Sequence, residues 1–429
     1  MKKDTVIIGF MLFALFFGAG NLIYPPTLGI EAGTSFWAAI AGFVLTGVGL
    51  PVLAVSAVSF VKNDARELAD RVHPLFGLIF TSLVYLAIGP FFGIPRAATV
   101  AFEMSVEPFA GSTSLLLFIF TTVFFVLVYI VSMNPSKIVD RIGQFLTPVL
   151  VLAIVTLSIG GFLLLNTPTE NPIEKYTDTP LFTGFVEGYL TMDAIAALAF
   201  GIIVVNAFKD RGVMQHHELV KSTLQAGLVA GIGLTAVYTS IGWIGSKMAS
   251  EGDFSNGGAI LSNAADMMFG SFGALLLGVI VALACFTTSV GLVVACGQFF
   301  HKITGFSYNW IIALVTAASY LVANQGLNTI ISVSVPVLTF IYPIAIVLII
   351  LTFLNRFFSG ARTVYLGAIL LTALVALYDG LAAFGVDMPA VTSVMQQLPF
   401  FSIGLGWLIP AIAGGLIGYL FKDKAEVFK

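Results

Sequence analysis

The chain has 429 residues, of which 58% are hydrophobic and only 10% are charged, and its mean hydropathy is +1.02. This balance excludes a soluble globular domain, and no nucleic-acid partner is expected. The net charge of −3 says little, because the charges are sorted by side of the membrane. Apolar stretches of about twenty residues recur from end to end, as is typical of an all-α polytopic membrane protein.

The first apolar segment, from about residue 5 to residue 30, contains the run F-G-A-G-N-L-I-Y-P-P at 17–26. Glycine weakens a helix and proline removes a backbone donor, so we expect this span to break near Gly18–Gly20. In a bilayer such a break survives only where protein buries it or where it lines a polar cavity. The freed amides attract an anion and the freed carbonyls a cation, so a zwitterion and a metal ion are the expected ligands.

The later spans are predicted in chain order from the apolar runs and the polar loops between them. They cover 36–61, 74–103, 115–131, 142–165, 181–208, 218–245, 274–300, 310–321, 329–354, 363–384 and 400–421, and a short re-entrant helix is expected at 258–268. Together with the first segment they make about twelve transmembrane helices.

The basic residues support this topology, because they sort by side of the membrane. With the N-terminus inside, the outer side holds only Lys175 and Lys247, and Arg96 lies within the third span. The inner loops and tails hold 16 of the 19 Lys and Arg residues: Lys2, Lys3, Lys62, Arg66, Arg71, Lys137, Arg141, Lys209, Arg211, Lys221, Lys302, Arg356, Arg362, Lys422, Lys424 and Lys429. The positive-inside rule therefore predicts a multi-pass protein of the cell membrane with both termini cytoplasmic.

Two pairs of features suggest an internal repeat. Pro148 and Pro336 lie in the runs F-L-T-P-V-L and S-V-P-V-L-T, 336 − 148 = 188 residues apart, and Gly201 lies 201 − 18 = 183 residues beyond Gly18. An odd number of helices in each copy forces the copies to be inverted. We predict a 5+5 inverted repeat, residues 1–166 and 181–355, with discontinuous helices 1 and 6, followed by two C-terminal helices in 359–421. Chance recurrence of P-V-L is the alternative.

The runs G-A-G-N-L-I-Y-P-P in the first span, G-P-F-F-G-I-P-R-A-A-T-V-A-F-E in the third and M-D-A-I-A-A-L-A-F-G in the sixth resemble the branched-chain amino acid:cation symporter family. The chain is also similar to bacterial leucine transporters and neurotransmitter:sodium symporters, whose A-x-x-T-S pattern corresponds to A-C-F-T-T-S at 284–289. The resemblance implies a secondary symporter, not an enzyme, that imports leucine, isoleucine or valine with sodium by alternating access. Ile23 and Tyr24 stand where the neurotransmitter group has an arginine, so that group's outer gate cannot be transferred to this chain.

The resemblance also implies a sodium site between the first and eighth helices. Thr287 and Thr288 offer neighbouring hydroxyls, and Ala284 offers a carbonyl one turn earlier. Ala14 and Phe17 offer carbonyls just before the first break. Sodium is a hard cation that accepts such oxygen ligands. The alternative is that the threonine hydroxyls bond back to carbonyls of their own helix.

The substrate carboxylate is expected at the amides of Ala19, Gly20 and Asn21, with Gly18 and Gly20 permitting close approach to the backbone. Asn21 could also cap the second half-helix. The substrate ammonium is expected at carbonyls of a break in helix 6 at about 194–199, close to Asp193. An acidic residue within a span is a functional candidate, although Asp193 could equally be an interfacial cap.

The branched side chain needs an apolar pocket. Small residues of the sixth helix leave room for it, and aromatic residues of the third and sixth helices could close its walls. The candidates for this pocket are Ala194, Ala196, Ala197, Ala199, Phe200, Phe91 and Phe92. Arg96 and Glu103 share one helical face at i,i+7 and are interpreted first as members of buried ion pairs and second as gate elements.

Two alternatives stay open at this point. A neutral amino acid transporter of the same fold could use protons, with Asp193 or Glu103 titrating, and a channel is a further possibility. An enzyme is not expected, because no nucleophile, acid or metal-ligand constellation is found. Sodium is the expected co-transported ion, no organic cofactor is expected, membrane lipid is the other partner, and the sequence leaves the oligomeric state unknown.

Overall fold

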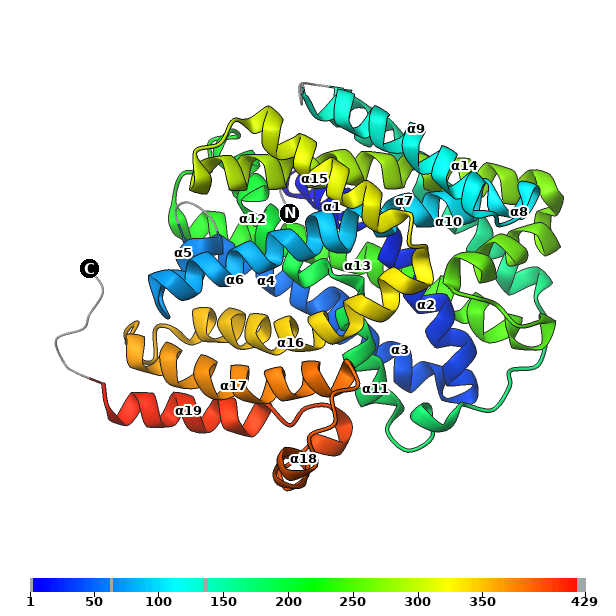
Figure 1. Cartoon of the computed structure of the whole chain (residues 1–429). Coiled ribbons are helices and arrows are strands. Elements are labelled where there is room, and N and C mark those ends of the chain that lie inside the picture. The colour runs from blue at the N-terminus through cyan, green and yellow to red at the C-terminus, as the bar shows by residue number, and fades with distance from the viewer. Residues whose placement is uncertain (1–2, 62–64, 134–137, 423–429) are drawn as a thin grey trace.

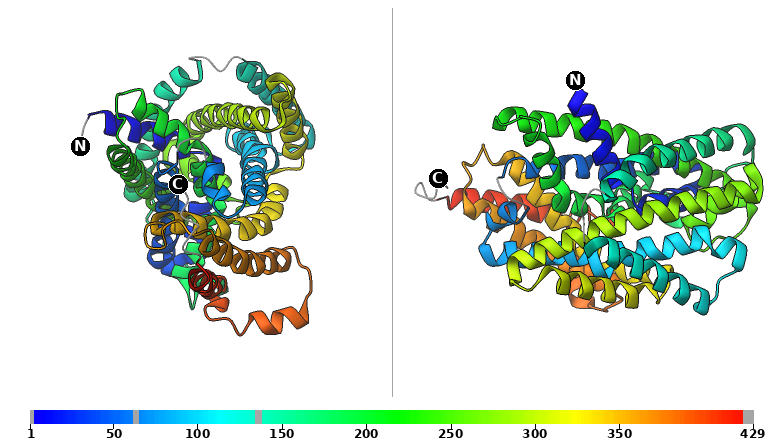
Figure 2. Two further views of the ribbon diagram at one scale, coloured as in Figure 1. Left: turned by 90° about the vertical axis from the view of Figure 1, so that its left-hand side faces the viewer. Right: turned by 90° about the horizontal axis from the view of Figure 1, so that it is seen from above.

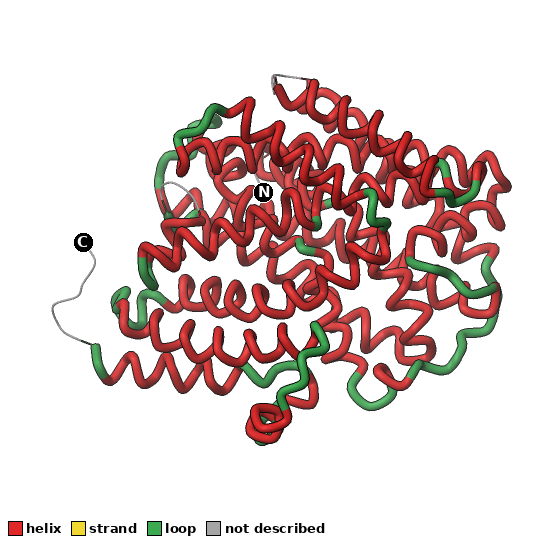
Figure 3. Tube along the Cα trace, viewed as in Figure 1, coloured by secondary structure: helices red, strands yellow, loops and turns green. Residues whose placement is uncertain are grey.

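The structure is a computed structural model of the whole chain and describes residues 3–61, 65–133 and 138–422, with the backbone alone for 138–147. All regular secondary structure in these described residues is helical (Figure 3). Long helices lie side by side, and the left view of Figure 2 looks along the axes of many of them. At one side α16 (Leu327–Leu354), α17 (Arg362–Ala383) and α19 (Leu408–Leu420) form a stack (Figure 1).

Seven helices of the described chain are long and apolar enough to cross a membrane, or up to eight if the bent pair Pro180–Thr191 and Asp193–Lys209 is one span. Three shorter apolar helices accompany them, at Pro148–Leu164, Tyr308–Ala323 and Leu408–Leu420. The predicted all-α polytopic class is confirmed. The count of about twelve spans and the inverted repeat remain predictions.

The first span breaks where its glycines indicate. α1 (Lys3–Phe16) ends before Phe17 and Gly18, and α2 (Ala19–Ala32) begins directly after them. Gly18 has an extended backbone, with φ −127° and ψ −171°. Pro25 and Pro26 lie inside α2 and do not end it. The prediction of a discontinuity near Gly18–Gly20 is therefore confirmed.

The sixth span also breaks, but not where we predicted. α11 (Pro180–Glu187) continues into the 3₁₀ helix η5 (Gly188–Thr191), and α12 (Asp193–Lys209) leaves it at an angle of 47°. The hinge residue Met192 has φ 68° and ψ 5°. The predicted break at 194–199 is wrong, because alanine is the best helix former and the run A-I-A-A-L-A continues α12.

Two further spans have an interrupted helical backbone. The third span consists of α6 (Pro74–Leu86), the π-helical η3 (Ala87–Phe91) and α7 (Gly93–Ser105), with a non-helical backbone at Gly89. α14 (Gly257–Thr304) is kinked at Gly270, and its first part contains the predicted re-entrant helix 258–268. α7 packs along α14, and α2 packs along α13 (His216–Met248). The breaks are thus enclosed by α7, α13 and α14.

The remaining elements complete the helical scaffold around this centre. They are η1 (Gly33–Ser35), α3 (Phe36–Val44), η2 (Leu45–Gly49), α4 (Leu50–Val58), α5 (Ala65–Asp70), α8 (Glu107–Ala110), α9 (Ser114–Met133), α10 (Ile138–Leu164), η4 (Glu174–Tyr176), η6 (Ala249–Glu251), α15 (Tyr308–Ala323), α18 (Pro389–Met395) and η7 (Phe401–Ile403). Of the basic residues used for the topology, Lys2, Lys62, Lys137, Lys424, Lys429 and the side chain of Arg141 lie outside the described residues.

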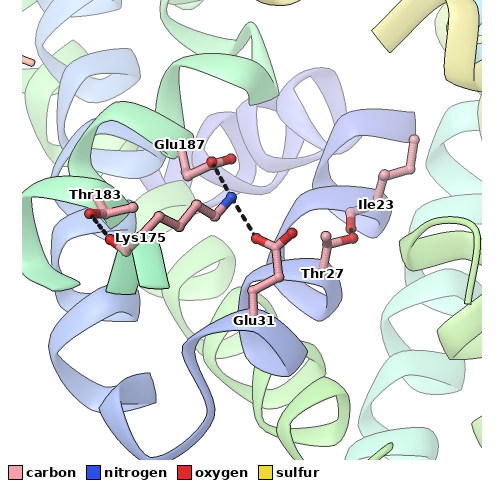
Figure 4. Close-up of polar contacts among 6 residues, drawn as sticks. All are labelled: Ile23, Thr27, Glu31, Lys175, Thr183 and Glu187. Atoms are coloured by element: carbon pink, nitrogen blue, oxygen red, sulfur yellow. Dashed lines mark hydrogen bonds and ion pairs between the residues drawn. The ribbon is translucent and has the colours of Figure 1, made fainter. Parts of the chain in front are cut away.

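Two ion pairs of Lys175 join the two broken spans at a distance from the breaks. The Nζ of Lys175, in the short 3₁₀ helix η4, lies 2.6 Å from a carboxylate oxygen of Glu31 at the end of α2 and 3.0 Å from one of Glu187 at the end of α11 (Figure 4). Ile173 N donates to Glu31 O at 2.9 Å. Burial lowers the pKa of Lys175, but the charges of Glu187 and Glu31 outweigh it and the net shift is upward. The ammonium therefore stays charged at neutral pH.

Candidate functional site

A small cavity lies where the break of the first span faces the break of the sixth. Its volume is about 50 Å³, below the several hundred Å³ of a typical ligand pocket. The predicted site residues that line it are Gly18, Ala19, Gly20, Asn21, Asp193, Ala196, Phe200 and Thr288, and Arg96 joins them from α7. A ligand of the size of an amino acid needs this cavity to widen.

A larger cavity, of about 290 Å³, lies elsewhere, between Glu103, Glu107 and Asp266. It adjoins neither break and is lined mainly by polar and acidic side chains of α7, α8 and α14. We place the candidate site at the smaller cavity, because interrupted helix ends supply polar backbone groups that can bind a solute within a membrane.

Asn21 connects the two breaks directly. Its Oδ1 accepts from Gly18 N at 2.9 Å, and its Nδ2 donates to Asp193 Oδ2 at 2.8 Å. The Tyr238 hydroxyl of α13 donates to the same Asp193 oxygen at 2.6 Å and also contacts Asn21 Nδ2. Asn21 and Asp193 are only 1% and 4% exposed. Asp193 thus lies in a buried polar network, and no motif or periodicity in the sequence predicts Tyr238 as its partner.

Arg96 forms hydrogen bonds to backbone carbonyls at the end of η5. Its Nη1 donates to Leu190 O at 2.7 Å and to the Tyr24 hydroxyl at 3.3 Å, and its Nη2 donates to Thr191 O at 3.0 Å. The guanidinium carbon lies 5.5 Å from the centre of the Tyr24 ring, within cation–π range. The interpretation of Arg96 as a member of a buried ion pair is wrong, because the partners found for it are neutral groups.

Glu103, two helical turns further along α7, also lacks the ion pair we predicted. Its carboxylate accepts from Asn256 Nδ2 at 2.6 Å, and Asn256 Oδ1 in turn caps α14 by accepting from Gly258 N at 2.9 Å. No ion pair of Arg96 or Glu103 occurs among the residues the structure describes. An i,i+7 spacing shows a shared helical face, but it does not show which groups the face meets.

The backbone groups of the site differ from expectation on the helix 6 side. The carbonyls of 194–199 lie in the regular helix α12 and are not freed by a break. The freed carbonyls are those of Leu190 and Thr191, which Arg96 already binds. On the α2 side, Asn21 N donates to Gly18 O at 3.2 Å, while the amides of Ala19 and Gly20 have no carbonyl a helical turn earlier in α2.

Of the residues predicted to bind sodium, Thr288 lines this cavity, whereas Ala14, Phe17, Ala284 and Thr287 are outside the lining. Thr288 lines the cavity, and its methyl carbon is 3.7 Å from the point where a Cβ on Gly18 would lie. Thr287 Oγ1 donates to Ala284 O at 2.9 Å, which is the bond to its own helix expected as the alternative. This bond leaves the lone pairs of the hydroxyl oxygen available to a cation. Ala14 lies in the last turn of α1, and Phe17 follows that turn directly.

Charged metal ligands are not gathered at this place. Within the described parts of the chain, no group of three or more His, Cys, Asp or Glu side chains could hold a metal ion.

The apolar candidates separate into residues inside and outside the cavity. Ala196 and Phe200 line it, whereas Ala197 is fully buried at other contacts and Ala194 lies outside the lining. Phe91 is 47% exposed on the molecular surface, and Phe92 is buried without lining the cavity. The α7 residue that reaches the cavity with a polar group is Arg96, not either phenylalanine.

A helical membrane fold with a polar cavity between the broken ends of two spans is the arrangement of a secondary transporter. The sequence matches, over residues 1–425, the family described as branched-chain amino acid transport protein, and the chain belongs to that family. It is 47% identical to the branched-chain amino acid permease BrnQ of Bacillus subtilis (strain 168), over 98% of each chain. It is 46% identical to the permease BraB of the same organism, over 97% of this chain and 95% of the relative. The protein is thus a membrane transport protein, not an enzyme.

Comparison of the fold gives a consistent result. The structure is similar to that of Mhp1, a nucleobase-cation-symport-1 family transporter, in a closed conformation with bromovinylhydantoin bound. The TM-score is 0.61 at 17% sequence identity, over 97% of this chain and 91% of the other. At this identity the likeness concerns the fold alone.

Proposed function

We propose that this protein imports leucine, isoleucine and valine together with sodium, by alternating access around the cavity between the two breaks. The family and the names of the two permeases support the substrate class. The observation that carries the proposal is the composition of the cavity wall. Helix-end amides at Ala19 and Gly20 and the carboxylate of Asp193 share one cavity with apolar Ala196 and Phe200.

Each part of an amino acid has a counterpart in this wall. The substrate carboxylate binds the first amides of α2, where the helix dipole favours a negative charge. The ammonium binds Asp193, which lines the cavity and whose carboxylate also accepts from Asn21 Nδ2. The branched side chain packs against Ala196 and Phe200. Sodium binds beside Thr288, between α14 and the last carbonyls of α1.

The sodium gradient is sufficient as a driving force. One sodium ion that falls through about 100 mV contributes about 2.3 kcal/mol. A tenfold concentration gradient adds about 1.4 kcal/mol, and together these support roughly 500-fold accumulation of a neutral zwitterion.

Proton coupling is the second candidate, and one observation favours it. Asp193 is a carboxylate buried in the membrane-spanning part of the fold, with Tyr238 and Asn21 as its hydrogen-bond partners. A carboxylate in that position can exchange a proton with a cavity that opens alternately to the two sides. In that mechanism the protonated state of Asp193 would replace sodium as the coupled charge.

Uptake of radiolabelled leucine into proteoliposomes distinguishes these candidates. We expect an inward sodium gradient to drive accumulation, and lithium or potassium gradients to drive much less. Accumulation under a proton gradient without sodium would replace the sodium proposal by proton coupling. A conductance that does not saturate with substrate would indicate a channel and contradict both.

A further inference from the structure

We propose that Arg96 binds the carboxylate of the transported amino acid, together with the first amides of α2. The inference rests on the proposed function and deepens it, because it names a side chain of α7 as the group that makes the substrate's carboxylate necessary. Three observations carry it: an unused donor on Arg96, the position of its guanidinium beside Gly20, and its separation from Asp193.

The first observation is that the buried guanidinium is incompletely bonded. Arg96 is 4% exposed and lines the cavity. Its Nη1 and Nη2 donate to Leu190 O, Tyr24 and Thr191 O, but its Nε is buried without a hydrogen-bond partner. An unpaired buried donor on a charged group is costly. A carboxylate placed against the edge formed by Nε and Nη2 would satisfy it, and arginine binds carboxylates through two adjacent donors.

The second observation is the contact between Arg96 and the start of α2. A Cβ on Gly20 would lie 2.6 Å from Nη2 and 3.0 Å from Cζ of Arg96. The guanidinium therefore lies directly against the backbone whose amides form the positive end of α2. Two positive groups meet at one point of the cavity wall, and an anion bound there is attracted by both. The absence of a side chain at Gly20 is what allows them to meet.

The third observation is that the two buried charges of the cavity are not paired with each other. Arg96 is held by carbonyls and a tyrosine hydroxyl, and Asp193 is held by Asn21 and Tyr238. No ion pair within 4.0 Å joins them among the described residues. A zwitterion whose carboxylate binds Arg96 and whose ammonium binds Asp193 compensates both charges. A simple amine or a simple acid compensates only one and leaves the other buried and unpaired, which is unfavourable.

A purely structural function of Arg96 makes a different prediction. If Arg96 only fixes the end of η5 through Leu190 O and Thr191 O, its loss should weaken all ligands by a similar factor. If it binds the carboxylate, its loss should affect only ligands that carry one. L-leucinamide has the shape of leucine without the negative charge, so the leucine-to-leucinamide affinity ratio separates the two functions.

The experiment measures binding of labelled leucine to the purified full-length protein in sodium, with competition by leucinamide, for the wild type, Arg96→Gln and Arg96→Lys. We expect Arg96→Gln to weaken leucine by about ten- to a hundredfold and leucinamide by less than about threefold. Arg96→Lys keeps the charge but not the paired donors, so it should give an intermediate ratio. If Arg96→Gln does not fold, Arg96→Lys decides alone.

Arg71→Gln is the matched control, because Arg71 Nη1 also donates to a tyrosine hydroxyl, that of Tyr365 at 3.1 Å, but lies away from the cavity. It should leave the ratio unchanged. If the Arg96 variants lose affinity for leucine and leucinamide by the same factor, so that the affinity ratio is unchanged, the inference is overturned. Failure of the wild type to bind any branched-chain amino acid would instead contradict the proposed function, so the two failures are distinct.

Discussion

Gly20 gives the sharpest test of where the substrate carboxylate lies. A Cβ at this position would meet Arg96 Nη2 at 2.6 Å and the carbonyl oxygen of Thr191 at 3.0 Å. Gly20→Ala is thus the smallest change that forces the guanidinium away from the start of α2. Gly20→Val adds two methyl groups with one strongly preferred rotamer in a helix, so it leaves less freedom to adjust.

The expected loss follows from the hydrogen bonds at risk. Arg96 binds Leu190 O at 2.7 Å and Thr191 O at 3.0 Å, and bonds from a charged donor are each worth about 1.5–3 kcal/mol. If Gly20→Ala costs the equivalent of one such bond, leucine binding weakens by about ten- to a hundredfold. With Gly20→Val we expect no measurable binding, although the protein should remain folded and inserted in the membrane.

The assay is equilibrium binding of labelled leucine to purified protein, with size-exclusion chromatography to establish folding. Gly291→Ala is the control, because Gly291 lies in α14 and a Cβ there meets no heavy atom within 4 Å. It should bind leucine normally and gain up to about 1 kcal/mol of helix stability. If Gly20→Ala, or above all Gly20→Val, binds leucine as the wild type does, the start of α2 is not the carboxylate site.

Three further predictions follow from the same geometry. Thr288→Ala should raise the sodium concentration for half-maximal uptake at least about tenfold. Ser289→Ala should not, because the fully buried Ser289 hydroxyl has no hydrogen-bond partner. If Thr288→Ala has the sodium dependence of the wild type, Thr288 is not part of the ion site. Ala196→Val should favour valine over leucine by about 1–3 kcal/mol, while Ala197→Val, outside the cavity lining, should leave the ranking of competitors unchanged. Lys175→Met should increase deuterium uptake around 168–191, because the ammonium of Lys175 binds the carboxylates of Glu31 and Glu187 and its upward-shifted pKa keeps it charged at neutral pH; unchanged uptake would contradict this.

The first break could be predicted from sequence because its cause is local. Gly18 and Gly20 stand within a single run of the chain, and their weak helix propensity is visible without knowledge of any neighbour. The same holds for the long apolar helices, whose length and composition are set by the bilayer. Features whose cause lies within a few residues are the ones that the sequence predicts well.

The second break could not be placed, because its causes are distant. The hinge residue Met192 is not glycine, yet it has a positive φ of 68°. The end of η5 is held by Arg96, which lies 94 and 95 residues before the two carbonyl groups that it binds. The small alanines that follow pack inside α12 and do not interrupt it. A pattern of small residues therefore signals close packing, and only the tertiary contacts show where the helix ends.

The candidate site shows the same division. Gly18 and Thr288 were predicted from their motifs and do meet at the cavity, whereas Phe91, adjacent to the motif glycine and proline of the third span, is 47% exposed at the surface. Tyr238 escaped prediction because it approaches Asp193 from α13, 45 positions further along the chain. Adjacent residues of a helix point in different directions, so a motif identifies the segment but not the side chain that faces the ligand.

The polar contacts of the cavity also suggest how substrate binding and helix movement are coupled. Asn21 of α2 is bonded to Asp193 of α12 at 2.8 Å, so α2 cannot move away from α12 without breaking that bond. In the proposed transport cycle the substrate ammonium competes with Asn21 for the carboxylate of Asp193. The substrate carboxylate binds Arg96. A ligand shifts an equilibrium between conformations only by its difference in affinity for them. Because the substrate ammonium replaces the contact that joins α2 to α12, its binding alters the relative stability of arrangements that differ at this junction, whereas an acid without an ammonium group leaves the Asn21–Asp193 bond in place.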